Sequence, residues 1–176
     1  MKFLKSYTGA MVVLAAVILL SIPLGSHRSL VAERDKVEAQ FDLIAGDLQD
    51  CLDITANLGT VAGRYLDYEE LLGLLDSRVA LEDGLGLRDI PAARAAYEDL
   101  TAEAEEVFSA LEGQALTEKD AKYVQGFRTD LAAEADTIAR DSYNALAADY
   151  NARVLGSFPA SLLGSLTFVR PAAVFR

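Results

Sequence analysis

The sequence lacks most of the residues on which catalytic and metal sites are built. It has no tryptophan, one cysteine, Cys51, and one histidine, His27, among 176 residues. One cysteine excludes an internal disulfide, and zinc needs several Cys or His ligands at short spacing. A hydrolytic triad needs a base beside its nucleophile, and His27, at the edge of an apolar segment, fits an interfacial polar residue better. Glycine-rich phosphate-binding motifs are also absent. We therefore expect no enzyme, no metal and no cofactor.

Positive charge is scarce as well. The chain carries 16 Lys and Arg against 27 Asp and Glu, a net charge of −11. Residues 1–26 hold two lysines and no acid, so the remainder sits at −13. Phosphates would be repelled, which excludes nucleic acid as a partner, and the folded domain as a whole is not expected to adsorb to anionic lipid.

Acidic residues recur at helical spacing. Asp47, Asp50 and Asp53 step by three, and Glu103, Glu105 and Glu106 crowd a later segment. A di-metal bundle site uses Glu-x-x-His on two helices, which this sequence does not have. We interpret these residues as a solvated acidic face, with weak divalent-cation binding as the alternative.

The amino-terminal segment is apolar. Residues 6–26 carry no charge and residues 11–20 are uniformly apolar. Twenty helical residues span roughly 30 Å, the thickness of a hydrocarbon core. Residues 1–26 are therefore predicted to form a single-pass transmembrane anchor that contacts the bilayer through residues 6–26. A cleaved signal peptide is the alternative, because Lys2 and Lys5 precede the segment and Pro23 and Gly25 follow it.

The remainder of the chain has helical periodicity and no strand pattern. One apolar seam follows steps of three and four to about residue 80: Leu30, Val37, Phe41, Ile44, Leu48, Cys51, Thr55, Leu58, Ala62, Tyr65 and Leu72. Asn57, Gly63 and Gly73 are soft points at which the helix could kink or break. Cys51 is expected to be a small buried hydrophobe on this seam. The seam can pack within one chain or between copies, so a homo-oligomer stays an alternative.

Two further helices are predicted. Residues 82–89, with two glycines, are expected to form a loop. Asp89 and Pro91 suit a helix start, and Gly113 suits its end. Thr117 followed by Asp120 resembles a capping box and begins a last long helix that ends near Gly156. The fold class predicted is all-α: an amino-terminal transmembrane helix, then an antiparallel bundle of long helices over residues 27–157.

The last forty residues carry the most distinctive pattern. Tyr143-Asn144 recurs seven residues later as Tyr150-Asn151, which predicts that both pairs lie on one helix face. The pairs can be structural, with buried rings and amides bonded to neighbouring backbone, or they can bind a partner. The pattern continues in an apolar tail, residues 158–176, through Phe158, Pro159, Leu162, Leu166 and Phe175.

The tail needs a place to be buried, because residues 154–169 carry no charge yet are too few to span a bilayer. Three places are open: the bundle itself, the membrane interface, and another membrane protein. Arg170 and Arg176 flank the tail and could lie at lipid headgroups.

These features together resemble the LemA family of small, membrane-anchored bacterial helical proteins. The resemblance is strongest in residues 143–175, and Asp53, Asn57, Leu58, Tyr65 and Glu69 match family elements on the first helix. Asp50 and Cys51 stand where the family has paired arginines, and Arg64 and Tyr68 replace its Gly and His. Thr167-Phe168-Val169 replaces the usual Phe-Gly-Phe, so the chain looks like a divergent member.

The resemblance implies a location and a role. It implies an anchor in the bacterial cytoplasmic membrane with the bundle in the cytoplasm; the charges that flank the segment are nearly balanced and do not fix the orientation. It also implies a scaffold for other membrane proteins, linked to membrane proteolysis, envelope stress or membrane compartments. Two alternatives remain: a small enzyme or cation-binding protein with a cryptic carboxylate site, and a secreted or periplasmic helical binding protein.

Overall fold

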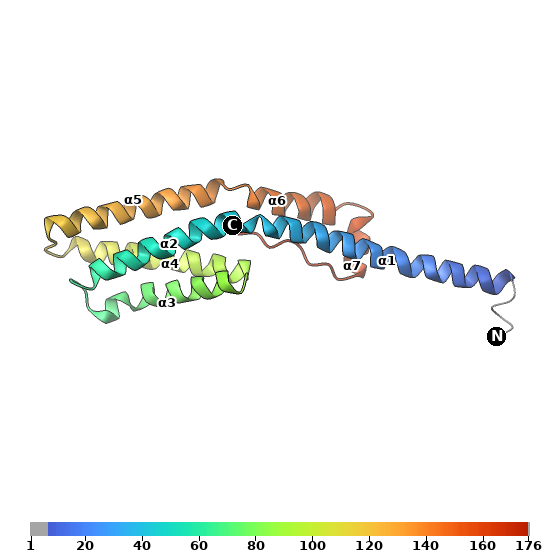
Figure 1. Cartoon of the computed structure of the whole chain (residues 1–176), viewed down its shortest axis with the longest axis horizontal. Helices are drawn as coiled ribbons and strands as arrows, with labels where there is room; N and C mark the ends of the chain where they lie inside the picture. The colour runs from blue at the N-terminus through green and yellow to red at the C-terminus, as the bar shows by residue number, and fades with distance from the viewer. Residues whose placement is uncertain (1–6, 176) are drawn as a thin grey trace. The chain divides into compact units, whose positions relative to one another are not determined.

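The computed structural model describes residues 7–175; between residues 7 and 24 it describes only the side chains of Met11, Leu14 and Ser21. This part of the chain is helical and contains no strand, which confirms the predicted all-α class. The elements are α1 (Tyr7–Ala39), α2 (Phe41–Ala62), α3 (Tyr68–Gly86), α4 (Ile90–Glu112), α5 (Glu118–Arg140), α6 (Tyr143–Asp149), the π-helix η2 (Tyr150–Leu155) and α7 (Ala160–Leu166) (Figure 1).

The chain divides into two compact units. One comprises the chain up to Ala39 together with Ala145–Ala172, and the other comprises Gln40–Asn144 together with the residues from Ala173 onward. We call them the α1 unit and the bundle unit. The predicted divisions after residues 26 and 157 follow sequence composition, whereas the compact units divide at other points.

The bundle unit is an up-and-down arrangement of α2, α3, α4 and α5 (Figure 1). Helix α3 packs on α4, and α2 packs on α5 and α3. The predicted seam supplies much of the core: Phe41, Ile44, Leu48, Cys51, Thr55, Leu58 and Ala62 are buried. The predicted helical bundle is therefore present. Helices α3 and α4 pack closely at Gly84, where a Cβ would lie 2.8 Å from the Ala93 backbone nitrogen.

The helices break at points that the periodicity did not place correctly. The seam does not run to residue 80, because α2 ends at Ala62 and α3 begins at Tyr68. The Asp67 backbone N–H donates to the Glu70 carboxylate at 2.8 Å, a capping interaction that starts α3. The predicted loop at 82–89 is shorter than expected, since α3 continues to Gly86.

The last predicted helix is also divided. It stops at Arg140, and Asp141 accepts the Tyr143 backbone N–H at 2.6 Å, which opens a new helix. The predicted start is confirmed, because the Thr117 hydroxyl accepts the Asp120 backbone N–H at 3.2 Å. The predicted start of α4 is confirmed too, with Asp89 accepting the Ala92 N–H at 3.1 Å.

In the α1 unit, α7 and η2 pack on α1 and on each other. Gly164 is buried at this contact, where a Cβ would lie 2.7 Å from Leu155 Cδ1 and 3.8 Å from Leu30 Cδ1. No helix in the described part of the chain is both long enough and apolar enough to cross a membrane. The predicted anchor begins outside the described residues, and most of its side chains lie outside them as well.

Candidate functional site

The first Tyr-Asn pair holds the end of the described chain inside the bundle unit. Tyr143 is fully buried, and its hydroxyl donates to the Ala173 carbonyl at 2.6 Å. The Asn144 side-chain oxygen accepts the Phe175 backbone N–H at 2.8 Å. Phe175 itself is buried, with its ring 5.6 Å from Phe41 and 5.8 Å from Tyr97. This pair therefore fixes the backbone of the tail, while Phe41 and Tyr97 pack on the Phe175 side chain.

The second pair does the same inside the α1 unit. The Tyr150 hydroxyl donates to the Leu30 carbonyl on α1 at 2.8 Å. Asn151 donates its amide to the Ala172 carbonyl at 3.0 Å and accepts the Ala172 N–H at 2.8 Å. Burial raises the pKa of Tyr150, which favours the neutral hydroxyl that donates. Both asparagine side chains thus hydrogen-bond backbone groups of the tail, Asn144 at Phe175 and Asn151 at Ala172.

The other residues of the predicted signature lie apart from these contacts. Phe158, Pro159, Leu162 and Leu166 are exposed on or just before α7, and the structure brings none of them to the buried tail that Phe175 occupies. The two pairs lie on different elements, α6 and η2, and not on one α-helix face as predicted. Each pair contacts its own part of the tail, Ala173 and Phe175 in the bundle unit and Ala172 in the α1 unit, while the intervening segment forms a separate surface.

An acidic group joins α2 and α5. Asp47, Asp50 and Glu134 each place one carboxylate oxygen within 4.8 Å of the others. Burial raises the pKa of Asp47 and of Glu134, and neighbouring carboxylates raise both further. Of the residues predicted as an acidic face, Asp53 lies outside this group and is exposed. The arrangement is one of mutual repulsion between partly solvated carboxylates.

Cys51 lies in the core beside this acidic group. It is fully buried, and burial together with Glu134 raises the pKa of its thiol to about 12. The prediction of a buried small hydrophobe is thereby confirmed, because a protonated, enclosed thiol is a poor nucleophile.

A second polar group fastens the start of α5. Arg64 donates to Asp120 at 2.7 Å, and the Tyr65 hydroxyl donates to the other Asp120 oxygen at 2.6 Å. Tyr65 in turn accepts the Thr117 backbone N–H at 3.2 Å. The Tyr65 hydrogen bond, with help from Thr117 and Arg64, lowers the pKa of Asp120. These contacts, which we call the Asp120 staple, connect the turn after α2 to the start of α5.

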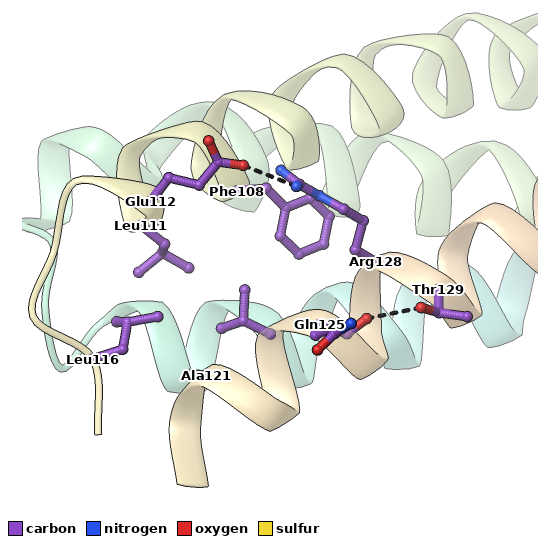
Figure 2. Close-up of a pocket in the computed structure, with 9 residues that line it drawn as sticks. Phe108, Leu111, Glu112, Leu116, Ala121, Gln125, Arg128 and Thr129 are labelled. Atoms are coloured by element: carbon purple, nitrogen blue, oxygen red, sulfur yellow. Dashed lines mark hydrogen bonds and ion pairs between the residues drawn. The ribbon is translucent and has the colours of Figure 1, made fainter. Parts of the chain in front are cut away.

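Two separate pockets lie between α4 and α5, which approach each other less closely than each approaches its packing partner, and we call the strip that contains both pockets the groove. At one end is a pocket of about 440 Å³, lined by Phe108, Leu111, Glu112, Leu116, Ala121, Val124, Gln125, Arg128 and Thr129 (Figure 2). At the other end is a pocket of about 260 Å³, lined by Arg94, Tyr97, Glu98, Ala135, Ile138, Ala139, Asn144 and Phe175.

Arg128 crosses this groove. Its guanidinium lies 4.8 Å from the centre of the Phe108 ring and donates to Glu112 at 2.9 Å (Figure 2). Glu105 lies 3.7 Å from the same guanidinium. The charge of Arg128 is thus more than balanced by α4, so the groove combines an apolar floor with an acidic rim.

Comparisons with models of protein families, with curated proteins and with solved structures find no match to this chain.

Sequence reasoning missed the Asp120 staple and the Arg128 crossing. Both join residues far apart in the chain, and helical periodicity gives no information on which faces meet. The sequence marks Asp120 only as a helix-start residue, because the burial that makes its carboxylate need a partner such as Arg64 is visible only in the structure.

Proposed function

We propose that this chain is a membrane-anchored scaffold without catalysis of its own, whose groove between α4 and α5 binds a helical segment of another membrane protein. The observation that carries the proposal is the groove itself. It is apolar at its floor, and its two pockets lie near the two ends of α4, one at Arg94, Tyr97 and Glu98 and the other at Phe108, Leu111 and Glu112. An amphipathic helix laid in a groove presents apolar side chains along one face, and these can enter pockets along the groove.

The charge of the bundle selects the partner. Residues 40–144 contain eight Lys or Arg against 23 Asp or Glu, a net charge of −15. On the groove, Glu105 and Glu112 outnumber Arg128, and Glu98 is paired with Arg94 at 2.8 Å. Complementary charge speeds encounter and excludes acidic competitors. The occupant we propose is therefore a basic amphipathic helix, and a second copy of this acidic bundle is disfavoured.

Residues 6–26 would hold the bundle at the membrane, in the bacterial cytoplasmic membrane with the bundle on the cytoplasmic side. This part of the proposal is supported by the uncharged sequence and by the resemblance to the LemA family, in which a helix of this kind is retained. That family's association with membrane proteolysis, envelope stress and membrane compartments makes another membrane protein the expected source of the helix.

The groove can be tested with a defined probe. A synthetic helix of leucine and lysine, patterned to present one apolar face, is titrated into the full-length chain in detergent, and binding is followed by fluorescence anisotropy. A helix of leucine and glutamate with the same pattern is the matched ligand control. The Ala121→Trp variant fills the groove with a bulky ring, and Ala133→Trp makes the same change at an exposed position of α5 outside the pockets.

We expect the lysine peptide to bind and the glutamate peptide not to bind. Ala121→Trp should weaken binding by about tenfold, equivalent to about 1.4 kcal/mol, while Ala133→Trp leaves it unchanged. If the two tryptophan variants behave alike, the peptide is held by general charge attraction and the groove is not the site.

A further inference from the structure

We propose that the outer face of α7, with the two phenylalanines that flank it, is a surface that inserts into the headgroup layer of an anionic membrane. The α7 patch consists of Phe158, Leu162, Leu166 and Phe168, which are 82%, 63%, 63% and 89% exposed. Four large apolar side chains exposed together on one short segment indicate an interaction surface.

The opposite face of α7 is already occupied. Gly164 is buried against Leu155 of η2 and Leu30 of α1, so this face packs within the α1 unit. Leu162 and Leu166 are one helical turn apart and share the other face. The patch is thus held outward by the packing of the unit.

Charge identifies the surface that the patch meets. The first acid in the chain is Glu33 and the last is Asp149, so residues 1–32 and 150–176 contain six basic residues and no acid. Residues 33–149 contain ten basic residues against 27 acids, a net charge of −17. The net charge of the whole chain hides this division. By compact unit, the α1 unit that carries the patch holds seven basic residues against four acids, and the bundle unit holds nine against 23. Anionic headgroups therefore attract the α1 unit and repel the bundle unit, whereas a second copy of the basic unit would be repelled.

A hollow adjoins the patch, and its lining combines apolar residues, among them Leu155, Val169 and Pro171, with the hydroxyl and charged groups that suit a lipid headgroup. It measures about 730 Å³ and is bordered by Ser161 and Ser165 of α7, by Arg170, and by Phe168 of the patch. Its charged and hydroxyl groups are potential donors to a phosphate, and no carboxylate lines it. Hydrogen-bond donors beside exposed phenylalanines match the junction between phosphate and acyl chain.

The position of α7 along α1 fits this depth. This step rests on the proposed function, since it takes residues 6–26 as the anchor. Leu30, the α1 residue that a Cβ at Gly164 would approach, lies four residues beyond Ser26, or about 6 Å along a helix. The headgroup region on each side of a bilayer is about 5–8 Å thick. The contact between α1 and α7, which can be followed in Figure 1, would therefore lie at the depth of that layer.

The test measures the depth of one side chain in the full-length chain. Leu162→Cys is labelled with an environment-sensitive fluorophore, and the protein is reconstituted in phosphatidylcholine vesicles with or without phosphatidylglycerol. Leu87→Cys, at an 80% exposed leucine of the bundle unit, is the matched control. Cys51 is buried and its thiol stays protonated, so labelling of the unmutated chain gives the background. Quenching is measured with spin-labelled lipids and with aqueous iodide.

We expect the label at 162 to be quenched by shallow spin labels, about 5–10 Å below the surface, and the label at 87 by iodide. Quenching at 162 should be stronger with phosphatidylglycerol. Arg170→Gln should remove that difference, whereas Arg140→Gln on the bundle should not. The proposal is overturned if the label at 162 responds to iodide as the label at 87 does. It is also overturned if neither quencher reaches position 162, because a protein then covers the patch.

A label at Met11→Cys separates this inference from the proposed anchor. Deep quenching at 11 with an aqueous label at 162 keeps the anchor and removes the patch. An aqueous label at 11 with shallow quenching at 162 removes the anchor and keeps the patch as an interfacial surface.

Discussion

Replacing Phe175 by alanine should destabilise the bundle unit by about 3 kcal/mol, because truncating a buried phenylalanine costs about 3–5 kcal/mol. Its side chain is only 5% exposed and packs against Phe41 and Tyr97. Each aromatic pair contributes roughly 0.5–1.5 kcal/mol beyond the area it buries. We take the lower end of the range because a tail relaxes into a cavity more easily than a helix does.

A loss of this size is a large part of the 5–15 kcal/mol that holds a typical domain together. For a chain of this length it corresponds to a fall in melting temperature of roughly 6–12 °C. Urea unfolding of the full-length chain in detergent, followed by far-ultraviolet circular dichroism, measures the change. The matched control is Phe168→Ala, the same substitution seven residues earlier at a side chain that is 89% exposed. It should stay within about 0.5 kcal/mol of the wild type.

Equal stability of the two variants would refute the reasoning, since it would mean that Phe175 is no more buried than Phe168. A large loss for both would refute it in a different way, by making the α7 segment part of the core.

For three other sets of substitutions, the structure determines whether stability rises or falls. Gly84→Ala should destabilise by about 1–3 kcal/mol because the new Cβ meets the backbone of α4, whereas Gly46→Ala, with open space around it, should stabilise by about 0.5–1 kcal/mol. Tyr65→Phe removes the main cause of the lowered Asp120 pKa. Its destabilisation should be full at neutral pH and shrink as pH falls below the ordinary value of 3.8, where the carboxyl protonates in both states. Glu134→Gln relieves repulsion and should stabilise by about 0.2–0.5 kcal/mol at pH 7.

Melting curves of Gly84→Ala and Gly46→Ala in the same buffer test the first prediction. If stability falls in both variants, or rises in both, the packing argument is contradicted. For Tyr65→Phe, a stability gap that persists unchanged at acid pH would show that the ring, not the hydroxyl, matters. The gain from Glu134→Gln should vanish as pH falls below 4.5, because a raised pKa costs stability only above the ordinary value. A loss of stability at pH 7 would instead indicate that the carboxylate has a partner.

The sequence was informative about which residues are buried and less so about where helices end. Steps of three and four located the core from Phe41 to Ala62, since one face of a helix must be apolar to pack. The same reasoning wrongly extends the helix past residue 63, because the tyrosine and leucine there suit a helix and no proline interrupts it. The break is marked instead by Asp67 and Glu70, whose carboxylates are typical of a helix start.

The candidate sites divide in the same way. The Tyr-Asn spacing was visible, and so was the need of the amides for backbone partners, because buried polar groups must be bonded. Which backbone they reach was not visible, since the tail lies 21 residues from Asn151 and 31 from Asn144. The groove between α4 and α5 could not be seen at all, because it depends on how closely two helices approach each other.

The backbone bonds of the two asparagines set rules for which amino acids the tail can accept. An amide that pairs with a peptide group does not detect the side chain beside it. Positions 172 and 175 each supply an N–H, so proline is forbidden at both. Ala173 supplies only its carbonyl to Tyr143, and residue 174 has no part in these bonds, so proline is compatible with the hydrogen bonding of both. Burial of Ala172 restricts that position to small residues, whereas the half-exposed Val174 is free to vary. Distant relatives should therefore keep both Tyr-Asn pairs, a small residue at position 172 and an aromatic residue at position 175, while the residues at positions 173 and 174 vary.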